Sequence, residues 1–153
     1  MKKLLEHPAL LVIARIVLAG VLIYAGGAKL INPVESRAAI VAYRLNLPEF
    51  LLKIGTTALP AFEVIVGLML LLGIYVRFSA LATAALMVVF IVMIAQVWYR
   101  GFSIDCGCFG GGGDVSPEGK EWRYTSEILR DLLFIGLAVL LARKPKSPFS
   151  ISA

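Results

Sequence analysis

The two cysteines of this chain lie one residue apart, in the peptide Asp105-Cys106-Gly107-Cys108-Phe109-Gly110. Residues at positions i and i+2 can reach the Cα separation that a disulfide needs, about 4.4–6.8 Å. Gly107, between them, lacks the Cβ that would resist a tight turn. The spacing therefore indicates a dithiol that can form and break a disulfide, with Cys106 and Cys108 as candidate catalytic residues.

Three interpretations of the cysteine pair are open at this point. A reversible disulfide needs an accessible thiolate. Lys29, Arg100 and Arg123 are candidate cations for it, whereas Asp105 would disfavour a neighbouring thiolate or accept its proton. A structural disulfide across one residue would constrain the unfolded chain little. A metal site is less favoured, because two thiolates and the lone histidine, His7, do not complete a four-ligand zinc site.

The composition is that of a membrane protein. Of the 153 residues, 59% are hydrophobic and 16% are charged, and the mean hydropathy is +0.88. A soluble domain is typically about 45–50% apolar and about 25% charged. The length suits a single integral membrane domain, residues 1–153. No basic stripe with interleaved aromatic residues accompanies the formal charge of +5, so we expect the lipid bilayer as a partner and no nucleic acid.

Four segments have the length or the apolar character to cross a bilayer. The predicted spans cover residues of about 9–30, 51–74, 78–98 and 126–142. The loop 99–125 carries the cysteines. The fourth span is weaker, because its uninterrupted apolar run is 132–142 and Arg130 and Asp131 precede it, although such charges can snorkel or face a polar pocket. The expected fold is an all-α four-transmembrane-helix bundle.

The distribution of positive charge predicts the orientation of these spans. With four spans, both termini lie on one side of the membrane. The cations on that side are Lys2, Lys3, Arg77, Arg143, Lys144 and Lys146, and those on the other are Arg37, Arg44, Lys53, Arg100, Lys120 and Arg123. The first set is concentrated in short stretches, so the positive-inside rule favours cytoplasmic termini. We therefore expect a multi-pass protein of the cell inner (plasma) membrane whose cysteine loop is extracytoplasmic, where disulfides persist.

The two predicted outer loops differ in character. In the first loop, a stripe at helical spacing follows Pro33 and consists of Val34, Ala38, Val41 and Leu45. It predicts a short interfacial helix on the outer leaflet, or equally a connecting helix packed on the spans. In the second loop, the four consecutive glycines 110–113 predict a mobile flap beside the dithiol that would suit docking of another protein.

Ionisable residues inside the predicted spans are costly and often functional. Arg15 lies about two turns inside the first span, and Glu63 lies near the middle of the second, three residues after Pro60. In antiparallel helices their depths differ by a few residues, which an arginine side chain can cover at about 1.5 Å per residue. We expect Arg15 and Glu63 to pair or share a polar network, either to fix helix packing or with Glu63 lining a pocket or relaying a proton.

Three stretches carry a family resemblance and follow one another along nearly the whole chain. They are Ala14-Arg15 … Gly20 … Tyr24-Ala25-Gly26-Gly27-Ala28-Lys29-Leu30, then Pro60 … Glu63 … Gly67 … Leu72-Gly73, and then Cys106-Gly107-Cys108-Phe109-Gly110. With them the chain resembles the DoxX-like superfamily and, within it, the MauE (methylamine utilisation) branch of redox-associated membrane proteins. Glycines, a lysine and a glutamate are common in membrane helices, so the cysteine pentapeptide makes the resemblance specific.

The resemblance implies a four-helix membrane protein associated with disulfide handling in the maturation of methylamine dehydrogenase, alongside a thioredoxin-like partner. Other DoxX relatives are linked to thiosulfate:quinone oxidoreduction, but the resemblance assigns no thiosulfate site to these residues. A relay of thiols across the membrane is not expected within this chain, because both cysteines fall on the outer side.

The residues and the resemblance together predict a membrane thiol-disulfide oxidoreductase. Cys106 and Cys108 would exchange electrons between an extracytoplasmic thioredoxin-like partner and, as a candidate carrier, membrane quinone, supporting disulfide formation or maturation of exported proteins. The supporting residues are Asp105, Lys29, Arg15 and Glu63. Two alternatives stay open, namely a non-enzymatic membrane assembly subunit with a structural disulfide and a small metal- or solute-binding membrane protein.

Overall fold

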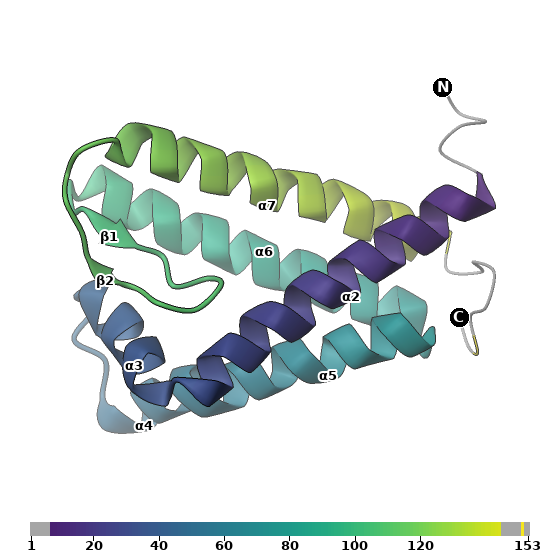
Figure 1. Cartoon of the computed structure of the whole chain (residues 1–153), viewed down its shortest axis with the longest axis horizontal. Coiled ribbons are helices and arrows are strands. Elements are labelled where there is room, and N and C mark those ends of the chain that lie inside the picture. The colour runs from purple at the N-terminus through teal and green to yellow at the C-terminus, as the bar shows by residue number, and fades with distance from the viewer. Residues whose placement is uncertain (1–6, 145–150, 152–153) are drawn as a thin grey trace.

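Long helices run side by side in the computed structural model, which describes residues 7–144 and 151 (Figure 1). These helices are α2 (Pro8–Ile31), α5 (Leu59–Leu72), α6 (Val76–Tyr99) and α7 (Lys120–Arg143). The shorter elements are α3 (Pro33–Ala42), α4 (Glu49–Lys53), the π-helical turn η1 (Ile54–Ala58), and the strands β1 (Ile104–Asp105) and β2 (Gly113–Asp114). The shorter elements gather at one end of the bundle, called the cysteine end from here on, while α2 begins and α7 ends at the opposite, terminal end.

Three helical segments within the described residues are long and apolar enough to cross a membrane. They are Pro8–Ile31, Glu49–Leu72 and Val76–Tyr99. Each matches a predicted span to within two residues at either end, so the helical framework is confirmed and these three segments are candidate membrane spans. Helix α7 also has 24 residues and packs along α6, but its first half is polar. The fourth span therefore stays a prediction.

Prolines and a glycine set the ends of several helices. Pro8 and Pro33 each occupy the first turn of their helix, where the missing N–H has no intrahelical partner to lose. Helix α5 ends at Gly73, whose φ of 71° is the left-handed conformation that commonly stops a helix. These boundaries explain why the first and second spans end where the sequence indicated.

Helices α2 and α5 pack closely because glycine faces the partner helix on each of them. A Cβ added at Gly26 would lie 2.5 Å from the carbonyl oxygen of Pro60, and one added at Gly67 would lie 3.1 Å from that of Ala19. Residue 26 therefore lies beside residues 60–64, and the same antiparallel register continues toward the terminal end.

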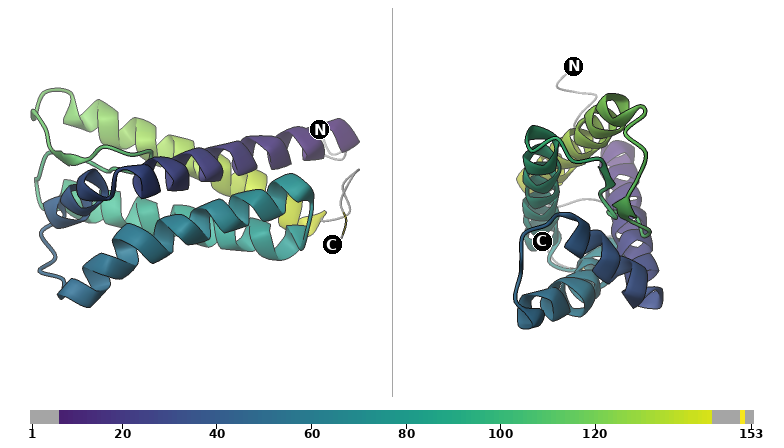
Figure 2. Two further views of the ribbon diagram at one scale, coloured as in Figure 1. Left: turned by 60° about the horizontal axis from the view of Figure 1, so that its bottom comes forward. Right: turned by 90° about the vertical axis from the view of Figure 1, so that its left-hand side faces the viewer.

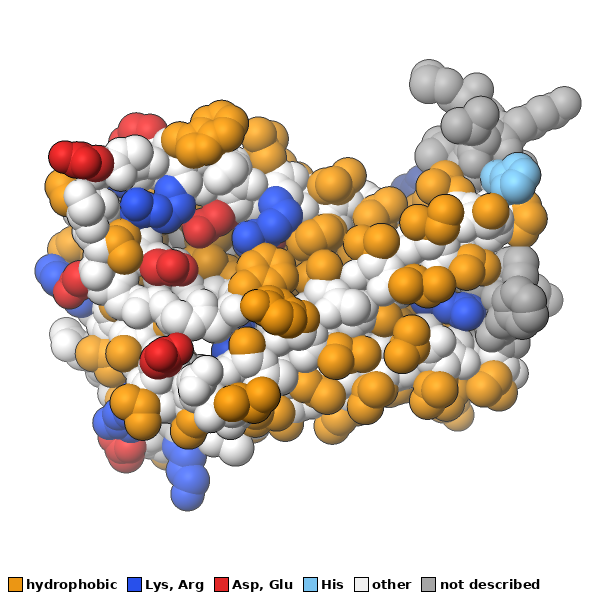
Figure 3. Space-filling view, viewed as in Figure 1, with side chains coloured by type: hydrophobic (Ala, Val, Ile, Leu, Met, Phe, Trp, Pro, Cys, Tyr) orange, Lys and Arg blue, Asp and Glu red, His pale blue; other side chains and the backbone are white. Residues whose placement is uncertain are grey.

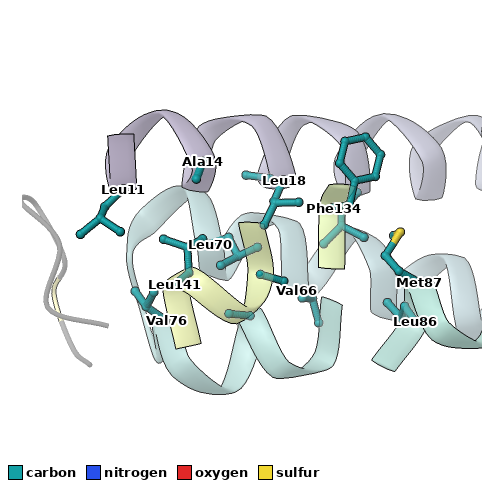
Figure 4. Close-up of a cluster of buried hydrophobic side chains, with 14 residues drawn as sticks. Leu11, Ala14, Leu18, Val66, Leu70, Val76, Leu86, Met87, Phe134 and Leu141 are labelled. Atoms are coloured by element: carbon teal, nitrogen blue, oxygen red, sulfur yellow. The ribbon is translucent and has the colours of Figure 1, made fainter. Parts of the chain in front are cut away.

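Two buried clusters fill the bundle. The first extends from its middle to the terminal end and brings together side chains of all four long helices (Figure 4). The side chains labelled there are Leu11, Ala14, Leu18, Val66, Leu70, Val76, Leu86, Met87, Phe134 and Leu141. The second cluster lies at the cysteine end and consists of Ala42, Tyr43, Ile94, Val97, Ile104, Cys108 and Tyr124. The cysteine loop is thus part of a hydrophobic core.

The outer surface is apolar along the helices and charged at the cysteine end. Figure 3 shows hydrophobic side chains along the visible faces of α2 and α5, with most of the charged side chains at the cysteine end, including the first half of α7. Ile13, Ile65 and Phe78 are each more than half exposed. Contiguous apolar surface of this extent suits lipid rather than water, so the bilayer is the expected surrounding of this surface.

Helix α3 confirms the short helix predicted after Pro33. Its stripe residues Val34 and Val41 are 80% and 52% exposed, while its buried face consists of Ser36, Ala39 and Ala42. The end view in Figure 2 shows α3 beside the cysteine loop at this end of the bundle. A helix lying on a leaflet would need such an exposed apolar stripe, and the small residues of its other face would pack on the protein.

The close approach of α2 and α5 gives a stability prediction. Gly26→Val should lower the free energy of unfolding by about 1–3 kcal/mol, because its side chain would overlap the Pro60 carbonyl. Gly20→Val is the matched control, since no neighbouring atom lies within 4 Å of a Cβ at that position. Thermal unfolding of both variants in detergent measures the difference, and equal stability would contradict the packing described.

Candidate redox site

Cys106 and Cys108 are joined in a disulfide, with their Cα atoms 5.3 Å apart. This is the bond that the spacing predicted. The two cysteine residues differ in surroundings, because Cys106 is partly buried whereas Cys108 is only 5% exposed and belongs to the second buried cluster. Cys106 is therefore the more accessible residue of the pair.

The turn that carries the cysteines is set by local hydrogen bonds. The Asp105 Oδ1 atom accepts the N–H of Gly107 at 3.0 Å, an Asx turn. The N–H of Cys108 donates to Cys106 Sγ at 3.2 Å. Gly107 has a φ of +66°, a left-handed conformation that disfavours side chains. Asp105 therefore shapes the turn itself, in addition to placing a carboxylate near the sulfurs.

The glycine-rich loop is packed rather than a free flap, which corrects the sequence-based expectation. Gly107 and Gly112 both contact Ala39 of α3, and Gly110 contacts Ala28 of α2. A Cβ added at any of these three glycines would come within 3.0 Å of the Cβ of that alanine. The strands β1 and β2 pair in antiparallel register. Residues 110–113 all have positive φ, and Gly110 and Gly112 also lie in close contacts, so this backbone path favours glycine.

Two buried tyrosines hold the loop, and neither was singled out from the sequence. Tyr43, just after α3, donates its hydroxyl to the Cys106 carbonyl at 3.0 Å. Tyr124 of α7 accepts the N–H of Ile104 at 2.9 Å and donates to the Phe102 carbonyl at 2.9 Å. Burial, with the nearby carboxylates as a lesser cause, raises the pKa of the Tyr43 hydroxyl, which therefore stays a donor at neutral pH.

A buried ion pair joins α2 to α5 at the level of the disulfide. The Lys29 Nζ atom lies 2.8 Å and 2.9 Å from the two carboxylate oxygens of Glu63. Lys29 is 7% exposed and Glu63 is fully buried. The ammonium also lies 5.0 Å from the centroid of the Phe90 ring. The prediction that Glu63 belongs to an ion pair holds, but its cation is Lys29 and not Arg15.

The register of α2 and α5 explains this correction. Because residue 26 lies beside residues 60–64, Arg15 lies level with the end of α5, about 21 Å along α2 from Lys29. The sequence estimate measured depth from the span ends and assumed that the ends are level. In the structure α2 extends past α5 at the terminal end, so Arg15, although buried, is remote from the disulfide.

Two cavities flank the disulfide. The first, called the inner cavity, has a volume of about 10 Å³, close to the least that holds one water molecule. Its polar lining residues are Glu63, Arg130 and Asp131, and its other lining residues include Cys108, Phe90 and Phe109. The second, called the lateral cavity, has a volume of about 180 Å³ and is lined by Lys29, Tyr43, Gly55, Leu59, Val89, Phe90, Met93, Cys106, Gly107 and Cys108.

The charges at the start of the fourth predicted span face this site. Asp131 is 1% exposed and pairs with Arg130 at 2.9 Å, while the Arg130 guanidinium lies 4.5 Å from the Phe109 ring centroid. This is the polar pocket that the sequence allowed for. Of the other candidate cations, Arg100 donates instead to the Tyr43 carbonyl at 2.9 Å.

One group of side chains at the site has ligand types that metals use. A sulfur of Cys106 and carboxylate oxygens of Asp105 and Glu127 lie within 4.8 Å of one another. In the disulfide form the sulfur is not a thiolate, and the thiolate is the form that binds metals. Only after reduction would the three residues offer a set of charged ligands.

The buried ion pair gives a second stability prediction. Lys29→Met or Glu63→Met alone should cost about 3–5 kcal/mol of unfolding free energy, because each leaves a buried charge without its partner. The double variant Lys29→Met/Glu63→Met should be considerably more stable than either single variant. Denaturation of the four proteins in one detergent completes the cycle. Additive losses would mean that the two side chains do not interact.

A match to a known protein family covers the whole described bundle. Comparisons with curated proteins and with solved structures give no match. The family model of the methylamine utilisation protein MauE matches residues 7–144, which include α2, the ion pair, the cysteine loop and α7. The DoxX-like superfamily of the earlier resemblance is not part of this match. The chain belongs to the MauE family.

Proposed function

We propose that this protein is a membrane thiol-disulfide oxidoreductase whose Cys106–Cys108 pair exchanges disulfides with an extracytoplasmic thioredoxin-like protein. It passes the electrons to a membrane carrier such as quinone and supports disulfide formation or maturation of exported proteins. The observation that carries the proposal is the asymmetry of the disulfide. The Cys106 residue is partly exposed at the end of the bundle, whereas Cys108 is buried beside two cavities, one lined by Glu63 and the other by Lys29.

The proposed topology has four spans in a single integral membrane domain, residues 1–153, with cytoplasmic termini. Helix α7 serves as the fourth span. Of its early charged residues, Arg130 contacts the Phe109 ring, and both Arg130 and Asp131 line the inner cavity. The cysteine end faces the extracytoplasmic side of the inner (plasma) membrane, with α3 on the outer leaflet. The six cations on the terminal side fall in short stretches of the sequence, whereas the six at the cysteine end are spread over two longer loops, and this difference in density supports the orientation.

Disulfide exchange follows from the two environments. A partner thiolate attacks Cys106 Sγ, the bond between Cys106 and Cys108 breaks, and Cys108 leaves as a thiolate that takes up a proton. The second thiolate of the partner then attacks the mixed disulfide and releases Cys106. The partner leaves with a disulfide, and this protein holds two thiols, so two electrons and two protons have been transferred.

The supporting residues have separable roles in this scheme. Lys29 lines the lateral cavity with both cysteines, so its positive charge favours the departing thiolate. Glu63 holds Lys29 in place and lines the inner cavity with Cys108, where it can relay a proton. Asp105 fixes the turn. Arg15 supports the terminal end of α2 and takes no part at the sulfurs.

Specific observations also favour the alternatives. Burial of Cys108 and the hydrogen bond from Tyr43 to Cys106 would equally suit a structural disulfide that shapes a docking loop in an assembly subunit. The proximity of Asp105, Cys106 and Glu127 would suit a metal-binding protein after reduction. Thiol reactivity separates these functions, because only the first requires exchange at Cys106.

The asymmetry predicts which cysteine captures a partner. With a thioredoxin-fold protein whose single active-site cysteine carries thionitrobenzoate, Cys108→Ser should release the dye about tenfold faster than Cys106→Ser, because its free thiol is the exposed one. The double variant Cys106→Ser/Cys108→Ser is the control for background release. If both single variants fold but release the dye as slowly as this control, the exchange function is rejected.

The orientation is tested with a matched pair of new cysteines. In the variant without native cysteines, Asn46→Cys at the cysteine end and Tyr75→Cys at the terminal end both place a thiol at an exposed position with a positive φ. A membrane-impermeant maleimide should label residue 46 in intact cells and residue 75 only after permeabilisation. The reverse pattern would place the cysteine loop in the cytoplasm and contradict the proposed topology.

A further inference from the structure

The lateral cavity reaches the disulfide from the side of the bundle. Its walls include Gly55 of η1, Leu59 of α5, and Val89, Phe90 and Met93 of α6, and its lining also includes Lys29 and the cysteine turn. These wall residues belong to two helical segments that are long and apolar enough to cross a membrane. A path through this wall therefore begins at the lipid-facing surface.

The position of the opening follows from how the helices pair. The most extensive packing is between α2 and α5 and between α6 and α7, whereas α5 and α6 meet over a smaller area. Val89, on the wall of the cavity, is 52% exposed. The lateral cavity thus lies between α5 and α6, with the exposed Val89 on its wall and both cysteines in its lining.

Electron balance requires a second reactant for the cysteine pair. After exchange with a partner the pair is reduced, and it must be oxidised again before another cycle. The chain has two cysteines in all, so no second thiol pair of its own can accept the electrons. The acceptor has to reach the site from outside the chain, and the lateral cavity has walls from two candidate membrane-spanning segments.

We propose that a lipid-soluble quinone binds in the lateral cavity, between α5 and α6, and oxidises the Cys106–Cys108 dithiol there; this inference rests on the proposed function. The two thiols form one S–S bond. Two electrons and two protons pass to the quinone oxygens, so that one quinone becomes one quinol.

The lining chemistry suits a quinone head. The apolar walls accept the ring, and Phe90 offers an aromatic face. The Lys29 ammonium has three donors, of which two go to Glu63, which leaves one for a quinone oxygen. The volume of about 180 Å³ is below the range of about 300–1,000 Å³ for pockets that enclose drug-sized ligands. It fits a ring whose tail remains in the bilayer.

The test blocks the opening without touching the disulfide. Val89→Trp fills the rim from α6, and Val88→Trp is the matched control, because residue 88 is similarly exposed at 48% but does not line the cavity. Leu59→Trp narrows the same opening from α5. Each protein is reconstituted in phosphatidylcholine nanodiscs, reduced with dithiothreitol, freed of reductant, and mixed with a short-chain ubiquinone analogue. The rates of disulfide formation and quinol formation are measured.

Wild-type protein and Val88→Trp should oxidise at similar rates, with one quinol formed per disulfide, while Val89→Trp and Leu59→Trp slow by about tenfold or more. Exchange with the thionitrobenzoate-labelled thioredoxin-fold protein should be unchanged in all variants, which shows that they are folded.

Equal quinone rates in all four proteins would overturn the lateral site. A wild-type protein that exchanges with the thioredoxin-fold protein but is not oxidised by quinone would overturn the quinone site and leave the proposed disulfide exchange at Cys106 standing. Loss of both reactions in the wild-type protein would reject the proposed function itself.

Discussion

The buried ion pair between Lys29 and Glu63 is the interaction on which the arrangement of the site depends. Two charges removed from water are tolerated in an apolar bundle only when each neutralises the other at hydrogen-bond distance, and both carboxylate oxygens accept from Lys29 within 2.9 Å. The pair can form only in one register of α2 against α5, the register in which Gly26 lies beside Pro60. Steric packing and electrostatics therefore select the same alignment, which also carries Ala28 to the position where the cysteine loop rests on it.

Features that depend on local sequence could be predicted, and features that depend on register could not. Apolar runs predicted the three candidate spans to within two residues at each end, because a candidate span is defined by its length and hydropathy. The Cys106–Cys108 bond followed from spacing. The partner of Glu63 did not follow, because Arg15 and Lys29 are both cations on α2 and only the relative offset of two helices decides between them. The small residues Gly26 and Gly67 were a signal for that offset, since closely packed helices place such residues at their contact.

The cysteine loop shows a different limit. Four consecutive glycines are typical of a flexible linker, yet here positive φ angles and contacts with Ala28 and Ala39 require glycine at a fixed path. Composition cannot distinguish the two cases, because both depend on the absence of a Cβ. The contacts of Tyr43 and Tyr124 could not be predicted either, since their hydrogen-bond partners are backbone groups of a loop that is distant in sequence. A tyrosine following the predicted short helix, and another in the polar half of a membrane-associated helix, would have been reasonable candidates for such contacts.

A packed loop has a consequence for how a single cysteine pair could serve two reactants. A mobile loop could carry its sulfurs from one reactant to the other, whereas a loop fixed by two tyrosines and by contacts with α2 and α3 keeps them in place. Both reactants then have to come to the same two atoms from different directions. The structure offers two such directions, the end of the bundle, where Cys106 is partly exposed, and the wall between α5 and α6, where the lateral cavity reaches both cysteines. Separate access from water and from lipid would keep a protein thiol and a lipid carrier from competing for space, and this removes the need for a second cysteine pair to connect them.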